Sequence, residues 1–362
     1  MKKVIFLSAI ALAAAVSCSK SEVVDTKFES EAIGFETYLG RGAQTKATET
    51  TVANLEEFGV YGFYTGAQTY EAAALTTANL MDNQNVYKDG GVWKYKPARY
   101  WNHEDDYYTF FAYAPYSVGK AGGAPEISYA VPSELADQED VIYAVNAKNV
   151  TKTSCTNNGT TAVPFQFKHA LARLAVKANA QMYHADGSEV TEEKPLVDKE
   201  EPDNTFTITN ISIEGKFCTT GTMNLTTPYT TTDGVTTGGP VWNATPSEKP
   251  VTYNLTGTVQ QQLDGSLYDF SANTDKGYLM MMPTEFSEAN PAVLSVTYYV
   301  TYAGKKSNSI TKTVNVPTNF EQGKAYAINI KLQRDSNNAI TFTVSEVSGW
   351  GTGSTQTPVI KG

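Results

Sequence analysis

The side chains that most often catalyse reactions or hold metals are few and scattered in this sequence. Its three histidines, His103, His169 and His184, form no pair of the H-E-x-x-H kind that would bind zinc. No G-x-S-x-G nucleophile elbow, P-loop or closely spaced cysteine pair is present. His169 lies between Phe167 and Leu171, which favours a hydrogen-bonded, partly buried histidine over a general base. The pattern predicts no enzymatic activity, metal or cofactor.

One cysteine near the N-terminus has surroundings that predict a chemical modification. Two lysines and an apolar run over residues 4–16 form a secretory signal that covers residues 1–17. The segment AAAVSC, which ends at Cys18, resembles the lipobox of bacterial lipoproteins, with Ala15 where leucine is commoner. We therefore expect cleavage before Cys18 and lipidation of its thiol, which would anchor the chain by acyl burial. The alternative is cleavage elsewhere, with Cys18 an ordinary thiol.

The other two cysteines are Cys155 and Cys218. They could form a disulfide in an oxidising compartment, or both could stay free inside the protein. The sequence does not show how far apart these two thiols lie in the folded protein, so both possibilities stay open.

An acidic and aromatic run, RYWNHEDDYYTFFAYAPY, is the strongest local candidate for a ligand site. Trp101, Tyr107 and Tyr108 could form a platform on which a sugar ring stacks, because aromatic faces offer apolar area with a polar rim. The alternative is that these aromatics fill a core. We favour the core, because the run continues through Phe110 and Phe111 like a strand buried on both faces.

Length and charge limit the class of protein. A chain of 362 residues is longer than one hydrophobic core usually supports, which predicts two domains. Beyond the signal there is no apolar run of about 20 residues, the length that a membrane-spanning helix needs. The formal net charge is −10 at pH 7, which excludes nucleic acid as a partner.

The first expected strand covers residues 33–39. Its residues alternate with a period of two, as in a half-buried strand, with one face formed by Ile33, Phe35 and Leu39 and the other by Glu36 and Tyr38. The polar residues on either side have the composition of a tether. Residues 18–51 are thus expected to be a lipidated N-terminal segment that contains one strand, just ahead of Arg41.

Residues 52–158 are expected to form a first, all-β domain. Short β-type runs alternate with turn residues in FGVYGFY, NVYKDGGVWKYK, YYTFFAYAP and DVIYAVNA. The turn Asp89-Gly90-Gly91 predicts a hairpin, because glycine accepts the positive φ of tight turns. Only residues 71–81 have some helical periodicity.

Residues 159–362 are expected to form a second domain after the linker-like segment TKTSCTNNGTT. The run VPFQFKHALARLAV predicts strand structure with a bend at residues 168–170. Residues 226–248 are rich in Thr, Gly and Pro and predict a long loop. Many short strands at regular spacing predict two β-sandwiches in tandem, followed by a C-terminal tail.

Several segments in this order resemble the fimbrillin family, the type V pilus subunits of Bacteroides and Porphyromonas. They are SCSKSEVVD, ARYW, YYTFFAYAP, FQFKHALARLAV, FTITNISIEG, GYLMMMP, GKAYAINIKLQ and ITFTVSEVSGW. The resemblance covers nearly the whole chain from Cys18 to Trp350. It implies two tandem transthyretin-like β-sandwiches and a role as a structural subunit of a surface fimbrium.

The resemblance also implies a route of maturation. In the family, a lipoprotein precursor reaches the outer membrane, and a trypsin-like protease cuts after a basic residue in the N-terminal segment. The cut removes the lipid and the first strand, and a C-terminal strand of the next subunit fills the groove. Carried over to this chain, Arg41 matches the position of the cut and Lys46 is the alternative.

The donor strand is less clear from the sequence. Ile340, Phe342 and Val344 alternate as a donor would, and Trp350 could plug the groove. After Trp350 only Val359 and Ile360 are apolar. Residues 340–347 can equally be the last strand of the second sandwich.

Two functions are therefore compared. The first is a subunit exported as a lipoprotein precursor, matured and polymerised by strand exchange, whose partners are neighbouring subunits and, through Cys18, outer-membrane lipid. Its place would be the outer membrane and then the cell-surface fimbrium, in support of adhesion. The second is a permanently anchored surface lipoprotein or tip adhesin that binds a glycan or host protein through Trp101 and its neighbours.

Overall fold

The computed structural model describes ten stretches of the chain, which are residues 31–39, 54–122, 125–196, 203–232, 235–257, 260–273, 277–302, 304–333, 340–346 and 359–360. Strands dominate them. The helices are single turns, α1 (Tyr70–Ala73) and α2 (Phe270–Asn273), with 3-10 turns η1 (Tyr116–Val118), η2 (Leu135–Asp137) and η3 (Thr153–Cys155). The expected all-β class is confirmed. No helix in the described stretches has the length and apolar character needed to cross a membrane.

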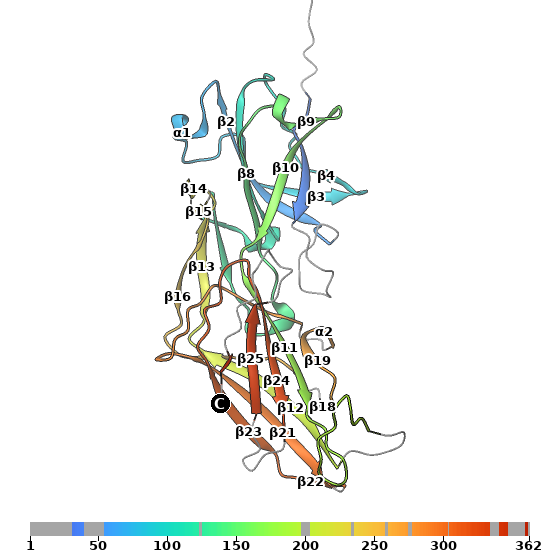
Figure 1. Cartoon of the computed structure of the whole chain (residues 1–362). Coiled ribbons are helices and arrows are strands. Elements are labelled where there is room, and N and C mark those ends of the chain that lie inside the picture. Colours follow the sequence, from blue (N-terminus) through green and yellow to red (C-terminus); the bar gives the residue numbers. More distant parts are fainter. Residues whose placement is uncertain are drawn as a thin grey trace, which may run out of the picture.

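The first sheet contains eight strands. Its order is β1 (Gly34–Leu39), β10 (Thr160–His169), β8 (Ile142–Val150), β5 (Tyr107–Ala114), β2 (Glu57–Gly66), β3 (Met81–Asp89) and β4 (Val92–Lys94), and β9 (Thr156–Asn157) pairs with β10. The upper part of Figure 1 shows β8 and β10 beside the β3–β4 hairpin. Gly90 and Gly91 form the two-residue loop of that hairpin, both at positive φ, as predicted. The helical periodicity over residues 71–81 gives only α1, which ends where Ala74 adopts a left-handed backbone conformation, and β3 begins at Met81.

Both faces of the first sheet are covered. Along β5, Tyr108, Phe110 and Ala112 belong to a smaller core that also contains β1, while Phe111 and Tyr113 point into a larger core. The expectation that this aromatic run is a strand buried on both faces is confirmed. This sheet therefore lies between two hydrophobic cores, one against each of its faces.

The chain leaves the first sheet at Ala170 and Leu171, between β10 and β11 (Ala172–Ala180). The bend therefore follows His169, at the end of the predicted stretch. β10 begins at Thr160, after the expected boundary between residues 158 and 159, yet it pairs with β1 and β8. The first sheet thus extends to His169; the division into two domains itself stays a prediction.

Two further sheets form the lower part of the molecule in Figure 1. One has the order β19 (Tyr268–Asp269), β11, β24 (Ala325–Leu332), β25 (Ile340–Glu346) and β26 (Val359–Ile360), with β20 (Leu279–Met281) also on β11. The other has the order β17 (Val251–Asn254), β12 (Asn204–Gly215), β21 (Ala292–Tyr302) and β22 (Lys305–Lys306), with β18 (Gln261–Leu263) on β12 and β23 (Ile310–Val316) on β21. Their inner faces share the larger core, as in a sandwich.

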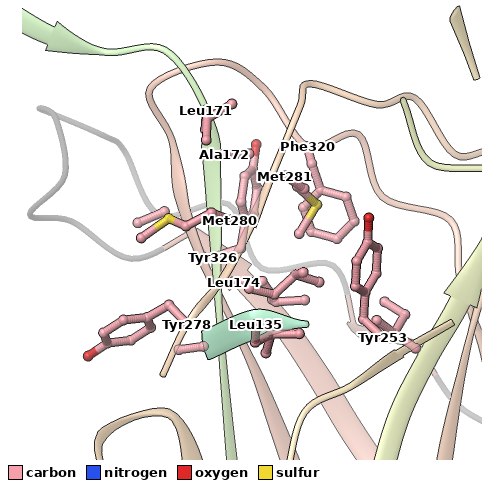
Figure 2. Packing of buried hydrophobic residues seen from close by; sticks show 14 of the residues in the cluster. Leu135, Leu171, Ala172, Leu174, Tyr253, Tyr278, Met280, Met281, Phe320 and Tyr326 are labelled. Atoms are coloured by element: carbon pink, nitrogen blue, oxygen red, sulfur yellow. The ribbon is translucent and has the colours of Figure 1, made fainter. Parts of the chain in front are cut away.

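A β-bulge in β12 keeps the apolar side chains of this strand pointing into the larger core. Phe206 and Ile208 are buried, and the next buried residues are Ile211 and Ile213, one position later than strict alternation would place them. The register against β21 shifts between Ile208 and Asn210, so one extra residue absorbs the slip. Figure 2 shows another part of this core, where Leu174, Met281, Phe320 and Tyr326 lie close together. The rings of Phe320 and Tyr326 are nearly perpendicular, with centroids 5.0 Å apart.

A four-stranded sheet connects segments that are far apart in sequence. Its order is β16 (Trp242–Pro246), β13 (Cys218–Asn224), β7 (Glu126–Ala130) and β6 (Lys120–Ala121). The expectation of one long loop over residues 226–248 is wrong, because β14 (Tyr229–Thr232) and β15 (Val235–Gly238) form a hairpin there and β16 follows. Threonine, which is frequent in this segment, favours strands because it is β-branched.

We expect Gly59→Ala to lower the free energy of unfolding by about 1–3 kcal/mol through overpacking. A Cβ at Gly59 would lie 2.3 Å from the ring of its cross-strand partner Tyr113, which is buried and donates a hydrogen bond of 2.6 Å to Asn83 Oδ1. Gly265→Ala is the matched control, since a Cβ at Gly265 would meet no heavy atom within 4 Å beyond its chain neighbours. Equal denaturation midpoints for the two variants would contradict the expectation.

Candidate strand-exchange site

Strand β1 runs parallel to β10 at the edge of the first sheet. The ladder has six residue pairs, from Gly34 opposite Ala162 to Leu39 opposite Phe167. The strand expected over residues 33–39 is thus present. Its main chain occupies an edge of β10 that would otherwise expose unpaired N–H and C=O groups.

The start of β1 is also held on its other side. The Ile33 N–H donates to Arg99 O at 2.9 Å, and the Trp101 N–H donates to Glu31 O at 3.1 Å. The Tyr95 hydroxyl donates to Ile33 O at 2.8 Å. Burial raises the pKa of Tyr95, which keeps this hydroxyl protonated and able to donate. The beginning of β1 therefore joins the edge of β10 to the segment of residues 99–101.

The inward face of β1 is apolar and well packed. Ile33 is 1% exposed and Phe35 is 7% exposed, whereas Tyr38 on the opposite face is 53% exposed. The Phe35 ring stacks on Phe165 of β10 at a centroid distance of 5.4 Å. Its other ring contacts are at 5.6–6.0 Å and belong to Tyr95, Phe58 and Phe110. The two faces expected from the sequence are the two faces observed, with Leu39 half-buried at the end of the strand.

These contacts describe a slot that β1 fills. If β1 left, the aromatic rings around Phe35 would face water and the edge of β10 would lose its ladder. Burial of one large side chain such as Phe35 contributes about 1.5–3 kcal/mol of transfer free energy. The chain would gain by accepting another strand with a similar apolar face. What the arrangement offers is therefore binding of an extended segment, without any catalytic step.

Four residues predicted to act in lipidation, maturation or plugging lie outside the described stretches. They are Cys18, Arg41, Lys46 and Trp350. Their roles stay predictions from the sequence.

The aromatic platform expected as an alternative is not on the surface. Trp101 is 2% exposed and Tyr108 is fully buried, with nearly perpendicular rings and centroids 4.7 Å apart. The Tyr108 hydroxyl accepts a hydrogen bond from Asn102 N at 2.7 Å, and Tyr107 is only half-buried. Trp101 and Tyr108 instead pack in the smaller core next to β1, so the stacking platform is a wrong interpretation. Alternating aromatics looked like a binding surface because sequence alone does not give their exposure.

The candidate donor strand is paired within its own chain. β25 is antiparallel to β24 over seven residue pairs, from Ile340 opposite Leu332 to Glu346 opposite Tyr326. β26 lies on the outer side of β25 through Phe342 opposite Ile360 and Thr343 opposite Val359. In the single chain, residues 340–346 are therefore a late strand of the lower sheet. Whether they are donated to another subunit stays a prediction.

Cys155 and Cys218 are free, and both are buried. Cys155 lies in the smaller core and Cys218 in the larger one, so they do not form the disulfide that the sequence left open. Burial raises the pKa of the Cys155 thiol to about 11, and it also raises the pKa of Cys218.

We expect neither buried thiol to react quickly with a thiol reagent at pH 8 in the folded protein. A raised pKa leaves little thiolate at this pH, and burial blocks access. The measurement is the rate of labelling of Cys155 and Cys218, located by peptide mass spectrometry, with and without denaturing urea. Fast labelling of either residue without urea would contradict the structure.

His169 is buried and hydrogen-bonded, as its apolar neighbours in the sequence predicted. His169 is 8% exposed, and its Nδ1 lies 2.8 Å from Oδ2 of the fully buried Asp140. His184 is also buried, with Nε2 3.1 Å from Lys194 O. Among the described residues, no three His, Cys, Asp or Glu side chains are grouped so that they could hold a metal ion.

The second neighbour of β1 was not found from the sequence. Residues 99–101 form only an isolated bridge, Tyr100 opposite Ala32, rather than a strand of ordinary length. The available signal was the short ARYW segment, which ends in two aromatic residues of a type that favours strands. That signal is too short to predict pairing.

Comparisons with known proteins agree with this architecture. Over 179 residues the chain is 30% identical to the fimbrium subunit Fim1C of Phocaeicola vulgatus, which covers 44% of this chain and 46% of that protein. The chain thus matches about half the length of this relative. A fimbrial protein from Bacteroides vulgatus, known from a crystal structure, has a TM-score of 0.57 at 20% identity, covering 88% of this chain and 99% of that one. This second likeness shows the fold.

The family follows from a match over most of the chain. A family model described as fimbrillin-like matches residues 45–350, which include both parts of the molecule and begin after β1. The all-β sheets agree with that match. The chain therefore belongs to the fimbrillin-like family.

Proposed function

We propose that this chain is a structural subunit of a cell-surface fimbrium that supports adhesion, and that its subunits join by strand exchange at the site of β1. The observation that carries the proposal is that an N-terminal edge strand covers an apolar aromatic slot, with Ile33 and Phe35 buried in it. Membership of the fimbrillin-like family supports it, as does the relative named as a fimbrium subunit.

Removal of β1 would make the binding of another strand energetically favourable. The slot then needs both a new ladder partner for β10 and new apolar side chains against Phe165 and its neighbours. A strand donated by another subunit supplies both. Because donor and acceptor are different surfaces of each subunit, the contact does not close on itself and produces a filament.

Maturation would separate two states of the chain. Lipid on Cys18 holds the precursor at the outer membrane while β1 fills the slot. A cut after Arg41, or alternatively after Lys46, frees the rest of the chain from the lipid. β1 then remains bound only by its non-covalent contacts, so that an incoming strand can replace it.

Limited proteolysis tests the proposal. The purified precursor is treated with trypsin at limiting dose, its new N-terminus is sequenced, and its oligomers are separated by SDS gel electrophoresis with and without boiling. We expect an N-terminus at Gly42 or Ala47 together with a ladder of multimers. The matched control carries Arg41→Gln and Lys46→Gln and should stay uncut at these two positions and monomeric. A chain cut at either position that remains monomeric under the same conditions would contradict strand exchange.

The alternative function is an anchored adhesin that binds a glycan or host protein through Trp101. The structure does not support a binding site at Trp101. Trp101 and Tyr108 have no exposed ring face to offer a ligand. An adhesive surface elsewhere is compatible with the subunit role.

A further inference from the structure

The two ends of β1 are held unequally. Exposure rises along the inward face, from 1% at Ile33 and 7% at Phe35 to the half-buried Leu39. Outside the ladder with β10, the only hydrogen bond that residues 37–39 form with described residues runs from the Tyr38 hydroxyl to Glu36, within the strand itself. The other hydrogen bonds between this segment and its described neighbours lie at the start of the strand.

A latch formed by Tyr95 and residues 99–101 makes these bonds. The Ile33 N–H donates to Arg99 O at 2.9 Å, and the Tyr95 hydroxyl donates to Ile33 O at 2.8 Å. Both main-chain polar groups of Ile33 are therefore bonded to the latch. One residue pair further out, the Trp101 N–H donates to Glu31 O at 3.1 Å.

The Tyr95 side chain joins the strand to the rest of the latch. Its hydroxyl also accepts a hydrogen bond from the Arg99 N–H at 3.3 Å, and its ring contacts the Phe35 ring at a centroid distance of 5.6 Å. Loss of the hydroxyl alone would leave Ile33 O without this donor while the ring contact remains. A buried carbonyl that loses its donor destabilises the state that buries it.

The ion pair at the start of β1 contributes less than these bonds. Lys152 Nζ lies 3.6 Å from Glu31 Oε2, and the two side chains are 24% and 47% exposed. The same ammonium lies 3.9 Å from Glu104 Oε1, so it has a second acidic neighbour. Because water screens such pairs, their contribution is usually small.

We propose that the latch keeps β1 in the slot after the chain is cut, so that β1 opens first at Leu39 and the opening of the latch sets the rate at which β1 leaves. This inference rests on the proposed removal of β1. It adds the step that controls the removal, and it makes Tyr95 a positioning residue for that step.

The order of the chain places the latch between the lipid and the slot. The proposed cut after Arg41 lies just beyond Leu39, at the loosely held end of β1. Cys18 precedes Glu31, so the lipidated piece is joined to the latched end. A pull on the lipid would therefore load the latch first, and the cut subunit would stay at the membrane until the latch opens.

The rate of release of β1 from the cut chain tests the latch. Full-length parent and Tyr95→Phe chains are cut with limiting trypsin, and the population cut only after Arg41 or Lys46 is identified by intact mass. Excess synthetic peptide of residues 31–39 then occupies emptied slots. The piece that contains β1 is followed over time by gel filtration and mass spectrometry. We expect the parent to retain this piece and Tyr95→Phe to release it about fivefold faster, the effect of one lost hydrogen bond.

Tyr87→Phe is the matched control for Tyr95→Phe. Tyr87 lies on β3 of the same sheet, is 36% exposed, and its hydroxyl forms no hydrogen bond with described residues. This variant should release β1 at the rate of the parent, and Lys152→Gln should change that rate less than about twofold. Release at the moment of cleavage in the parent, or equal rates for Tyr95→Phe and Tyr87→Phe, would overturn the proposal.

Spin labels at the two ends of the segment test the order of opening. Ala32→Cys and Tyr38→Cys chains, each with Cys18→Ser, carry a nitroxide at an exposed position. After the cut we expect the label at residue 38 to gain mobility first, while the label at residue 32 stays restricted until β1 leaves. A label at residue 38 that gains mobility no earlier than the one at residue 32 would contradict the proposed order.

The latch and the proposed function fail on different results. Chains that have lost β1 and still remain monomeric contradict strand exchange, whatever the rate of release. Chains that assemble, but release β1 equally fast with and without the Tyr95 hydroxyl, contradict only the latch.

Discussion

Phe35→Ala is expected to lower the free energy of unfolding of the uncut chain by about 3 kcal/mol, the lower end of the range for truncating a buried phenylalanine. The side chain is 7% exposed, stacks on Phe165 and contacts three other aromatic rings. β1 lies at a sheet edge, so partial release of the strand limits the loss. Chemical denaturation of the precursor, followed by tryptophan fluorescence, measures the change.

Tyr38→Ala is the matched control for Phe35→Ala. Tyr38 belongs to the same strand but points outward, and its hydroxyl donates only to Glu36 of the same strand, at 2.7 Å. We expect its denaturation midpoint to stay near that of the parent chain. Equal losses for the two variants would mean that β1 does not fill an apolar slot.

Asp140→Ala is expected to lower the free energy of unfolding by about 3 kcal/mol. This value is the upper end of the usual cost of an unsatisfied buried polar group and the lower end of the usual cost of breaking a buried pair. Asp140 is fully buried, and its Oδ2 lies 2.8 Å from Nδ1 of His169. The alanine leaves that imidazole nitrogen without this carboxylate in a site with little access to water. The change is measured by thermal and chemical denaturation.

The position of Asp140 makes the effect relevant to assembly. His169 is the last residue of β10, the strand that holds β1, and it pairs with Ile142 of β8. Loosening this end should therefore weaken β1 as well, visible as faster trypsin cleavage near Arg41. Lys94→Ala is the control, because it breaks an ion pair with Asp89 in which both side chains are more than half exposed. A similar loss of stability in both variants would contradict a special role for the buried pair.

Much of the site could be predicted from short stretches of sequence. The alternation in residues 33–39 gave both faces of β1, and the two glycines after Asp89 gave the β3–β4 turn. Period two and turn chemistry are local, so neighbouring residues are enough to determine them. The run around Phe110 likewise indicated a strand buried on both faces, because it is apolar at almost every position.

Other features could not be predicted from the sequence and became visible only in the folded structure. The threonine-rich residues 226–248 looked like a loop and form a hairpin and a further strand, because β-branched residues such as threonine favour strands. β10 appeared to begin the second domain but completes the first sheet. Pairing partners are selected among distant segments by the faces that they bury, and composition alone does not show that selection.

By itself, the sequence determined an all-β chain with an amphipathic strand over residues 33–39 and no catalytic motif, and it predicted a secretory signal over residues 1–17. Only the tertiary structure decided what that strand contacts: β10 on one side, residues 99–101 on the other, and the aromatic rings around Phe35 beneath it. It also moved Trp101 from a possible binding surface into the core. The physical reason is that the period of a strand is local, whereas burial depends on which distant segments cover it.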